Sequence, residues 1–358
     1  MTRKAISSVF AWIFIMIAGA LIISLFFLIA NNQAQASQDR LAANALQQVN
    51  TILSTQATSF DTSTRVPIPN DEIRIVCEAF RNNNQITLLS QLEIGGFSRV
   101  LENDLIVGRD IQANQLILFS KDWRAPYRAG NVLHVSSDNE LLVLKDVDSL
   151  AQSFEALQEA FPDAINQQEY TTGTTIDARG YSRVRVVALT DQSAPLNAAS
   201  IFNGVIQDHP QAHFILVKMD TSVSNDVLAT GEVYYYPRSD SRIGPYRYTG
   251  EAMLTGLIWQ ASPQEADCLQ HKLSVELARQ TTLQLARVQE LITAYSDAGN
   301  QACESLLGPG RLVELRDEAT RLTSATQPLY AFDIYNQAQE VTNQNERLLR
   351  GERCATIY

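Results

Sequence analysis

The sequence predicts an α+β protein with an N-terminal transmembrane helix, and three observations lead to this fold class. The first is an uncharged apolar run near the N-terminus, residues 5–30. The second is a central stretch, residues 71–262, in which short β-branched runs predominate. The third is a C-terminal stretch, residues 263–358, whose apolar residues recur at helical spacing. The central stretch also allows an α/β arrangement with a mixed sheet.

Residues 5–30 are long enough to cross a bilayer, because about 20 apolar residues in a helix span the hydrocarbon. A cleaved signal peptide is the competing interpretation, and Ala34-Gln35-Ala36 has the small-residue pattern of a cleavage site. The apolar core of a signal peptide is usually about 7–15 residues, which is shorter than this run. We therefore expect residues 1–31 to form a cytoplasmic tip and a retained anchor in contact with lipid.

Charges on the two sides of this run predict its orientation. Arg3 and Lys4 precede it, whereas the first charges that follow, Asp39 and Arg40, cancel. Basic residues stay on the cytoplasmic side of a membrane. The expected location is therefore a single-pass protein of the cell membrane, with its N-terminus in the cytoplasm and the residues after about 32 outside.

The start of the chain also resembles a processing signal. Arg3-Lys4-Ala5 followed by Ile6-Ser7-Ser8-Val9 and a long apolar helix is similar to the class III signal segments of archaeal type IV pilins. The resemblance implies cleavage between Ala5 and Ile6 by a prepilin peptidase and packing of the exposed helix in a filament core. The large downstream portion departs from the usual small pilin head, and a simple anchor with a basic start has the same features.

Residues 32–60 continue the helical pattern and predict a stalk helix that ends near Ser59. Apolar side chains recur four apart in this segment, at Leu41, Ala45, Val49 and Leu53. The stripe is expected to pack on the chain's own domain, and pairing with a partner helix is the alternative. An oligomer that forms through the anchor and stalk is compatible with this pattern.

A linker is expected at residues 61–70, because Pro67 and Pro69 cannot continue a helix. Beyond it, β-branched and alternating runs predict strands at 73–77, 86–89, 105–107, 116–119, 132–135, 141–144, 184–189, 214–217 and 232–236. An amphipathic helix is expected over 148–161 and another over 194–207. Strand, helix and strand between 184 and 217 indicate a crossover with parallel pairing, and no glycine-rich phosphate loop follows its first strand.

The last hundred residues predict helices at 263–297, 311–322 and 329–349. Each helix carries one apolar stripe, and the first stripe holds Leu269, Leu273, Leu277, Leu285, Val288, Ile292 and Tyr295. A single stripe per helix predicts a helical hairpin or a small bundle.

The four cysteines are disulfide candidates, because an even number outside the cell favours two disulfides. Cys268 begins the long helix and Cys303 lies beyond its end, which separates them by about 45 Å at 1.5 Å per residue. The following helices return toward the start, so we expect Cys354 to pair with Cys268. Cys77 would then pair with Cys303.

Composition and motifs give no sign of catalysis. The net charge of −11 argues against a nucleic-acid partner, which needs a surplus of basic residues. The spacing of His209 and His213 suits a metal only in a helix, and Pro210 interrupts it. No catalytic residue, cofactor site or metal site is predicted, and the protein is expected not to be an enzyme.

One aromatic and basic stretch is a candidate interaction surface. It contains Trp123, Arg124, Tyr127 and Arg128, and these residue types are enriched at binding hot spots. The competing interpretation is that the aromatic rings fill the core. Tyr234, Tyr235 and Tyr236, which alternate along one strand, are expected to be core residues.

Several segments taken together resemble a group of uncharacterised single-pass membrane proteins of small-genome, DPANN-type archaea. They are FAWIFIMIAGALII, LILFSKDWRAPYRAGNVLHV, YTGEAMLTGLIWQ and the terminal GERCATIY. The resemblance implies an archaeal membrane and an outward-facing domain, and it carries no activity. We therefore expect a membrane-anchored surface protein that binds or assembles with other surface or membrane proteins. The alternatives are a pilin-like subunit processed after Ala5 and a surface hydrolase whose site the sequence does not reveal.

Overall fold

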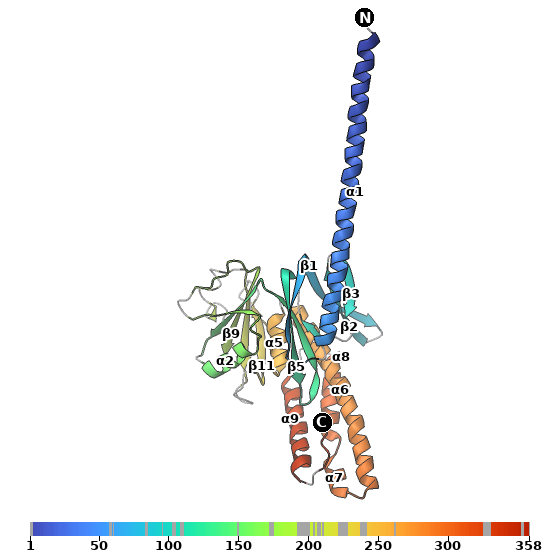
Figure 1. The fold of residues 1–358 in the computed structure, drawn as a ribbon. Helices are drawn as coiled ribbons and strands as arrows, with labels where there is room; N and C mark the ends of the chain where they lie inside the picture. The colour runs from blue at the N-terminus through green and yellow to red at the C-terminus, as the bar shows by residue number, and fades with distance from the viewer. Residues whose placement is uncertain are drawn as a thin grey trace.

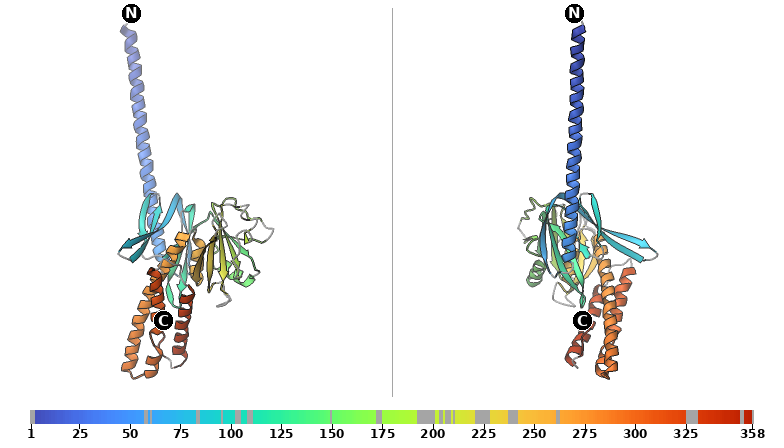
Figure 2. Two further views of the ribbon diagram at one scale, coloured as in Figure 1. Left: turned by 180° about the vertical axis from the view of Figure 1, so that it is seen from behind. Right: turned by 45° about the vertical axis from the view of Figure 1, so that its right-hand side comes forward.

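The computed structural model describes residues 3–56, 59, 61–82, 85–94, 96–101, 105–107, 111–148, 150–171, 175–191, 201–202, 205, 209, 211–220, 228–236, 242–260, 263–324, 331–351 and 354–357. These residues form an α+β protein with mixed sheets, as expected. A long helix, α1, projects from one end of the molecule, and a helical bundle extends from the other (Figure 1). Two sheets lie between them, and Figure 2 shows this arrangement from two further directions.

Helix α1 (Arg3–Gln56) runs without a break through the expected anchor and stalk. It ends at Gln56, a little before the expected end near Ser59. Its last turns bury a stripe of small and apolar side chains, namely Ala42, Ala45, Leu46, Val49 and Leu53. They pack with Ile73, Leu92 and Leu116 of the first sheet. The stripe expected from the sequence therefore packs on the chain's own domain from Ala45 to Leu53, whereas its first member, Leu41, is exposed.

The first sheet, sheet A, has six strands in the order β3-β2-β1-β5-β6-β4. All its pairs are antiparallel except β4 with β6. The strands are β1 (Ser63–Asn82), β2 (Gln85–Ile94), β3 (Phe97–Leu101), β4 (Leu105–Val107), β5 (Ile111–Arg124) and β6 (Arg128–Ser137). The expected strands from 73 to 135 are confirmed, and β3 is an addition to them.

Residues 61–70 are not the expected linker, because β1 begins at Ser63 and pairs there with β5. The prolines still affect the pairing, whose register shifts between Pro67 and Asp71. Pairing with β2 on the other side of β1 starts only at Ile73. The proline-containing half of β1 thus has one open side, where a residue without an N–H is tolerated.

The second sheet, sheet B, has the order β12-β11-β10-β9-β7-β8. Strands β8, β7, β9 and β10 are parallel, and β11 and β12 are antiparallel. Their bounds are β7 (Glu140–Asp146), β8 (Asn166–Glu169), β9 (Arg183–Thr190), β10 (His213–Met219), β11 (Thr230–Tyr236) and β12 (Ile243–Thr249). The parallel pairing of β9 with β10 confirms the expected crossover.

Two segments cover opposite faces of sheet B. Helix α2 (Ala151–Glu159) confirms the amphipathic prediction and packs through Phe154 and Leu157 on the face toward sheet A. The helix expected over 194–207 lies mostly outside the described residues. Within it, Ile201, Phe202 and Val205 pack on the other face of the sheet.

Helix α5 (Glu251–Trp259) lies between the two sheets and was not predicted. Every residue from 252 to 259 is buried, and the helix contacts β5 and β6 of sheet A and β11 and β12 of sheet B. A Cβ at Gly256 would stand 2.7 Å from Leu269 and 3.6 Å from Val132. The glycine therefore allows α5 to approach α6 (Pro263–Asp297) and sheet A closely.

The C-terminal helices form a bundle, which confirms that expectation. They are α6 (Pro263–Asp297), α7 (Gln301–Leu306), α8 (Gly310–Ser324) and α9 (Ala331–Gly351). Helix α6 leads away from the sheets to α7 at the far tip, α8 returns, and α9 leads away again (Figure 1). Leu269, Leu273, Leu277 and Val288 of the expected α6 stripe are buried.

The expected disulfide pairing is wrong, although all four cysteines are paired. Cys77 of β1 pairs with Cys268 of α6, and Cys303 of α7 pairs with Cys354 after α9. The bundle makes three long passes, which is an odd number. Helix α9 therefore ends near the far tip, which places Cys354 beside Cys303 and not at the start of α6 beside Cys268.

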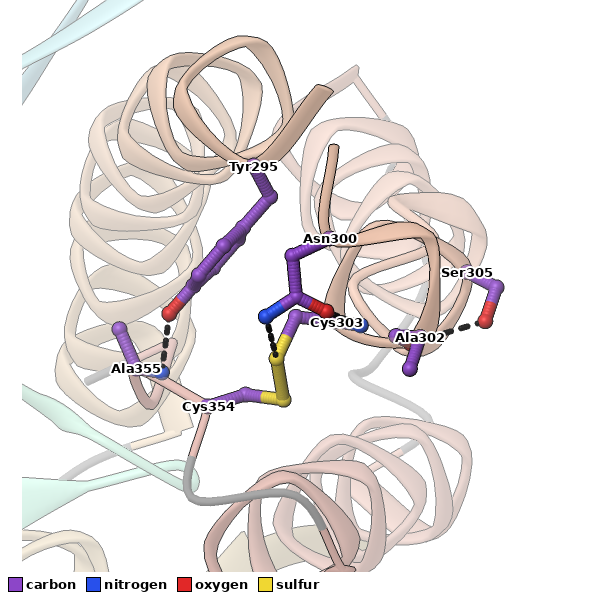
Figure 3. The surroundings of a disulfide bond; sticks show 7 residues. All are labelled: Tyr295, Asn300, Ala302, Cys303, Ser305, Cys354 and Ala355. Carbon is purple, nitrogen blue, oxygen red and sulfur yellow. Dashed lines mark hydrogen bonds between the residues drawn. A yellow bond between two sulfur atoms is a disulfide. The ribbon is translucent and has the colours of Figure 1, made fainter. Parts of the chain in front are cut away.

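Side chains around the second disulfide hold the tip together (Figure 3). Asn300 accepts a hydrogen bond from the Cys303 amide at 3.2 Å, and its amide nitrogen lies 3.3 Å from the Cys303 sulfur. The Tyr295 hydroxyl accepts from the Ala355 amide at 2.7 Å. The Cys303 side of the bond is thus tied to the start of α7, and the Cys354 side is tied to the last turn of α6.

Replacing both Cys303 and Cys354 with Ser should destabilise the bundle under oxidising conditions and change little under strong reductant. The bond joins residues 51 apart, and closure of a loop of that size stabilises a fold by about 4 kcal/mol in the chain-entropy account. Thermal unfolding in both redox conditions measures the difference. Non-reducing peptide mapping is the direct check, and a peptide that links Cys268 to Cys354 would contradict the structure.

Candidate functional site

The segment of α1 from Met16 to Ile29 exposes more large apolar side chains than any other element among the described residues. One helix is long and apolar enough to cross a membrane, and the domain buries none of its apolar window. The large side chains from Met16 to Ile29 are exposed, with Met16 at 73% and Phe27 at 74%. Polar residues such as Asn31 and Gln33 follow before the packed stripe starts at Ala42. This part of the helix suits a lipid environment by length and composition.

The junction between α1 and sheet A is closed by hydrogen bonds at the end of the helix. The Gln56 side chain, 4% exposed, donates to the Leu118 carbonyl at 3.3 Å and to the Thr64 hydroxyl at 3.0 Å. The Asn131 side-chain amide of β6 donates to the Gln56 carbonyl at 3.2 Å and to the Ser59 carbonyl. The last carbonyls of a helix lack partners within the helix, so Asn131 acts as a cap supplied by the sheet.

The candidate interaction surface is not supported for its aromatic members. Trp123 and Tyr127 are 2% and 4% exposed, so the alternative, core packing, is correct for them. The Trp123 indole donates to the Thr249 carbonyl at 3.1 Å, and the Tyr127 hydroxyl bonds Thr281 of α6. Both rings therefore connect sheet A to other elements.

The two arginines of the same stretch remain on the surface and bind one carboxylate. Arg124 lies 2.6 Å and Arg128 2.8 Å from the two oxygens of Asp122. Arg128 also donates to the Asn131 side-chain oxygen at 2.9 Å, which orients the amide that caps α1. The stretch from 122 to 131 thus positions the end of α1, a role that its composition did not indicate.

A second candidate region lies at the carboxyl ends of β7 and β9. The connection after β7 passes over one face of sheet B and the segment after β9 lies on the other, as α2 and Phe202 show. Open α/β sheets bind ligands where the connections diverge in this way. Sheet B resembles such sheets in the course of these connections.

The polar groups at this edge are paired with the protein. Asp148 accepts from the Thr190 hydroxyl and from the Asp191 amide, the latter at 3.2 Å. Lys145 donates to the Ile201 carbonyl and lies 5.4 Å from the centre of the Tyr170 ring. Partial burial lowers the pKa of Lys145. Among the described residues, no group of three or more His, Cys, Asp or Glu side chains is placed to hold a metal.

A third candidate is a groove of about 420 Å³ at the far tip of the bundle. Residues of the α7–α8 turn and of α9 line it, among them Ser305, Gly308, Arg311, Glu340, Gln344 and Arg347. Arg311 lies 2.9 Å from Glu314 and 3.7 Å from Glu340, so its charge is balanced. The lining is polar and carries both signs of charge, which suits recognition of a polar partner and supplies no catalytic arrangement.

His134 is a buried titratable group outside these regions. It is fully buried on β6, its ring stacks on Phe119 at 4.2 Å, and Nε2 lies 3.4 Å from the Thr255 hydroxyl. Its Nδ1 has no hydrogen-bond partner in the described part of the chain. Burial, and secondarily the charge of Lys121, lower the pKa of His134 to about 3. The ring is therefore neutral in the folded protein at ordinary pH.

The sequence prediction about His209 and His213 depends on whether the two residues share a helix. His213 is the first residue of β10, so it lies in a strand and not in a helix. Pro210 lies outside the described residues, so the loop between the two histidines is not described in full.

Comparison with protein-family models, with curated proteins and with solved structures found no match to this chain.

Replacing Asn131 with Ala should loosen the junction between α1 and sheet A. The loss of a buried hydrogen-bonding partner costs about 1–3 kcal/mol, and the Gln56 carbonyl is left with the Ser59 amide. Amide exchange should then accelerate over residues 53–56, while exchange in α6 stays unchanged. Arg124→Ala is the matched control, because Arg124 shares Asp122 with Arg128 and makes no hydrogen bond to Asn131. Equal exchange in the two variants would contradict the capping role.

Acid should destabilise the fold through His134. The imidazole of the unfolded chain takes up a proton near the ordinary histidine pKa of 6.5, whereas the folded one does so only near 3. The unfolded state thus binds more protons between these two pH values, and stability falls as pH drops, by about 1.4 kcal/mol per unit at most. Denaturant unfolding of His134→Leu between pH 6.5 and 4 should give a flatter profile than the parent. Parallel profiles would show that His134 does not carry this dependence.

Proposed function

We propose that this chain is a single-pass, membrane-anchored protein of the archaeal cell surface. Its N-terminus lies in the cytoplasm, and the domain after about residue 32 lies outside, where it binds or assembles with other surface components without catalysis. The observation that carries the proposal is the bare apolar surface of α1, from Met16 to Ile29, in a helix that continues into the domain. A helix with an exposed apolar circumference is stable in lipid and costly in water.

The disulfides support the outward orientation. Cys77–Cys268 and Cys303–Cys354 account for all four cysteines, and stable disulfides belong to oxidising compartments. Arg3 and Lys4 on the opposite side of the apolar run agree with this direction.

The tip of the bundle is the part of the domain that supports a binding role. It lies at the opposite end of the molecule from the N-terminus (Figure 1), so an anchored domain presents it away from the bilayer. The groove there has a volume within the range of about 300–1,000 Å³ typical of ligand pockets. Its lining carries both an exposed arginine, Arg347, and the carboxylate of Glu340. Such a groove suits a polar segment of another surface component.

A filament subunit is the second candidate. It is favoured by the unpartnered apolar half of α1, which is available to pack against other copies after cleavage between Ala5 and Ile6. N-terminal sequencing of the protein extracted from membranes separates the two candidates. A mature chain that starts at Ile6 supports the filament subunit, and a chain that keeps Arg3 and Lys4 supports the simple anchor.

Protease added to intact cells should remove the whole portion after about residue 32 and leave only the anchor in the membrane. The reason is that both the basic N-terminus and the disulfides favour an outside location for the domain. A variant with Arg3 and Lys4 replaced by Asn, and Asn31 and Asn32 by Lys, reverses the charge bias across the apolar run. Part of the variant molecules should then insert in the opposite orientation, with the domain protected from the protease. Complete protection of the parent domain would refute the orientation, and release by alkaline carbonate would refute the anchor.

A further inference from the structure

One stripe of α1 repeats in alternating steps of four and three residues across the membrane boundary. Its members are small or apolar throughout, at Met16, Ala20, Ile23, Phe27, Ala30, Ala34, Ser37 and Leu41. Alternating steps of this kind are the heptad spacing of a left-handed coiled coil. We call these eight residues the α1 seam.

The water-exposed end of the seam distinguishes it from a lipid-facing surface. Leu41 lies 12 residues beyond Ile29, or about 18 Å along a helix, which carries it out of the hydrocarbon. Its side chain is nevertheless 54% exposed. Its neighbours Asp39 and Arg40 are charged and exposed, so this leucine interrupts a polar surface. Leu41 thus extends the apolar side of the seam beyond the lipid.

The domain leaves the seam uncovered. The face of α1 that packs on sheet A is centred near Val49 and Leu53, whereas the seam passes through Ala34 and Leu41. At about 100° per residue, the two faces lie about 100° apart around the helix. A second helix can therefore lie along the seam while each domain stays to one side.

The identity of the partner follows from the anchor and the charges. Two copies in one membrane have parallel helices, so each seam meets the same seam of the other copy. Of the positions that flank the seam in the polar neck, Asn31, Gln33 and Gln38 are uncharged and do not repel their counterparts, and Arg40 carries a charge. Ala30, Ala34 and Ser37 are small enough for two helices to approach closely.

We propose that two copies of this chain pair in parallel and in register through the α1 seam, from Met16 to Leu41. The pairing rests on the proposed function, because a shared membrane is what aligns the two copies. It presents two distal grooves side by side, away from the bilayer.

Single cysteines in the full-length chain in its membrane test the pairing. On mild oxidation, Ser37→Cys and Ala34→Cys should form disulfide-linked dimers, because both positions face the partner. Gln35→Cys and Asp39→Cys are the matched controls, since both residues are exposed and lie on the other side of the helix. Adding Leu41→Asp to Ser37→Cys should lower the linked fraction by about tenfold, the change that ~1.4 kcal/mol of association free energy produces.

Each pattern of disulfide links supports or overturns the proposed pairing. Links at 34 and 37 without links at 35 and 39 support the seam. Equal links at all four positions indicate random collision and overturn it. In a mixture of Ser37→Cys and Ala30→Cys chains, two kinds of disulfide can form: between like positions or between position 30 of one chain and position 37 of the other. If the 30–37 disulfides are the more abundant, the contact is staggered and the proposed register is overturned. Alkaline extraction of the same membranes separates the failures: protein that is retained but unlinked refutes the seam, and protein that is released refutes the anchor.

Discussion

The Trp259 side chain at the end of α5 contacts both sheets at once. Its indole N–H donates to the Val135 carbonyl of β6 at 3.2 Å, and the guanidinium of Arg185 from β9 lies 4.6 Å over its ring. Arg185 in turn donates to the Trp259 carbonyl and pairs with Glu140, and both charged groups are almost fully buried. A buried charge without its partner is costly, so β7, β9 and α5 are held in one relative position. The two sheets share a single core for this reason, and Phe119 of β5 reaches the same tryptophan.

From this core, rigidity extends to both ends of the molecule. Sheet A receives the end of α1 through the cap that Asn131 supplies, and its β1 is joined to α6 by the Cys77–Cys268 disulfide. Helices α1 and α6 are therefore fixed to the same sheet. A protein built in this way holds its far tip at a defined distance and angle from the N-terminal part of α1, and a flexible tether would not.

Local signals in the sequence were sufficient for most strands, for the crossover between β9 and β10 and for the bundle helices, because alternation and helical spacing are properties of short segments. Helix α5 was missed because it is buried on all sides, so its residues show no polar face and no period. Strand β12 contains Pro245, which hides its strand character. For Trp123 and Tyr127, the same residue types serve hot spots and cores, and only tertiary placement decides between them. The disulfide prediction was wrong because it depended on how many times the helices run along the bundle. That number decides at which end of the bundle Cys354 lies.

The two disulfides also define how a mechanical force would travel through the chain. A covalent route leads from α1 into β1, crosses at Cys77–Cys268 into α6, and crosses again at Cys303–Cys354 to the end of the chain. Cys77 and Cys268 are 191 positions apart in sequence, and all of sheet B lies between them. Tension between α1 and the tip would therefore bypass sheet B and load β1 from Ser63 to Cys77 and the helix α6. The parallel strands, with their diverging connections, would be shielded from any pull on the bundle.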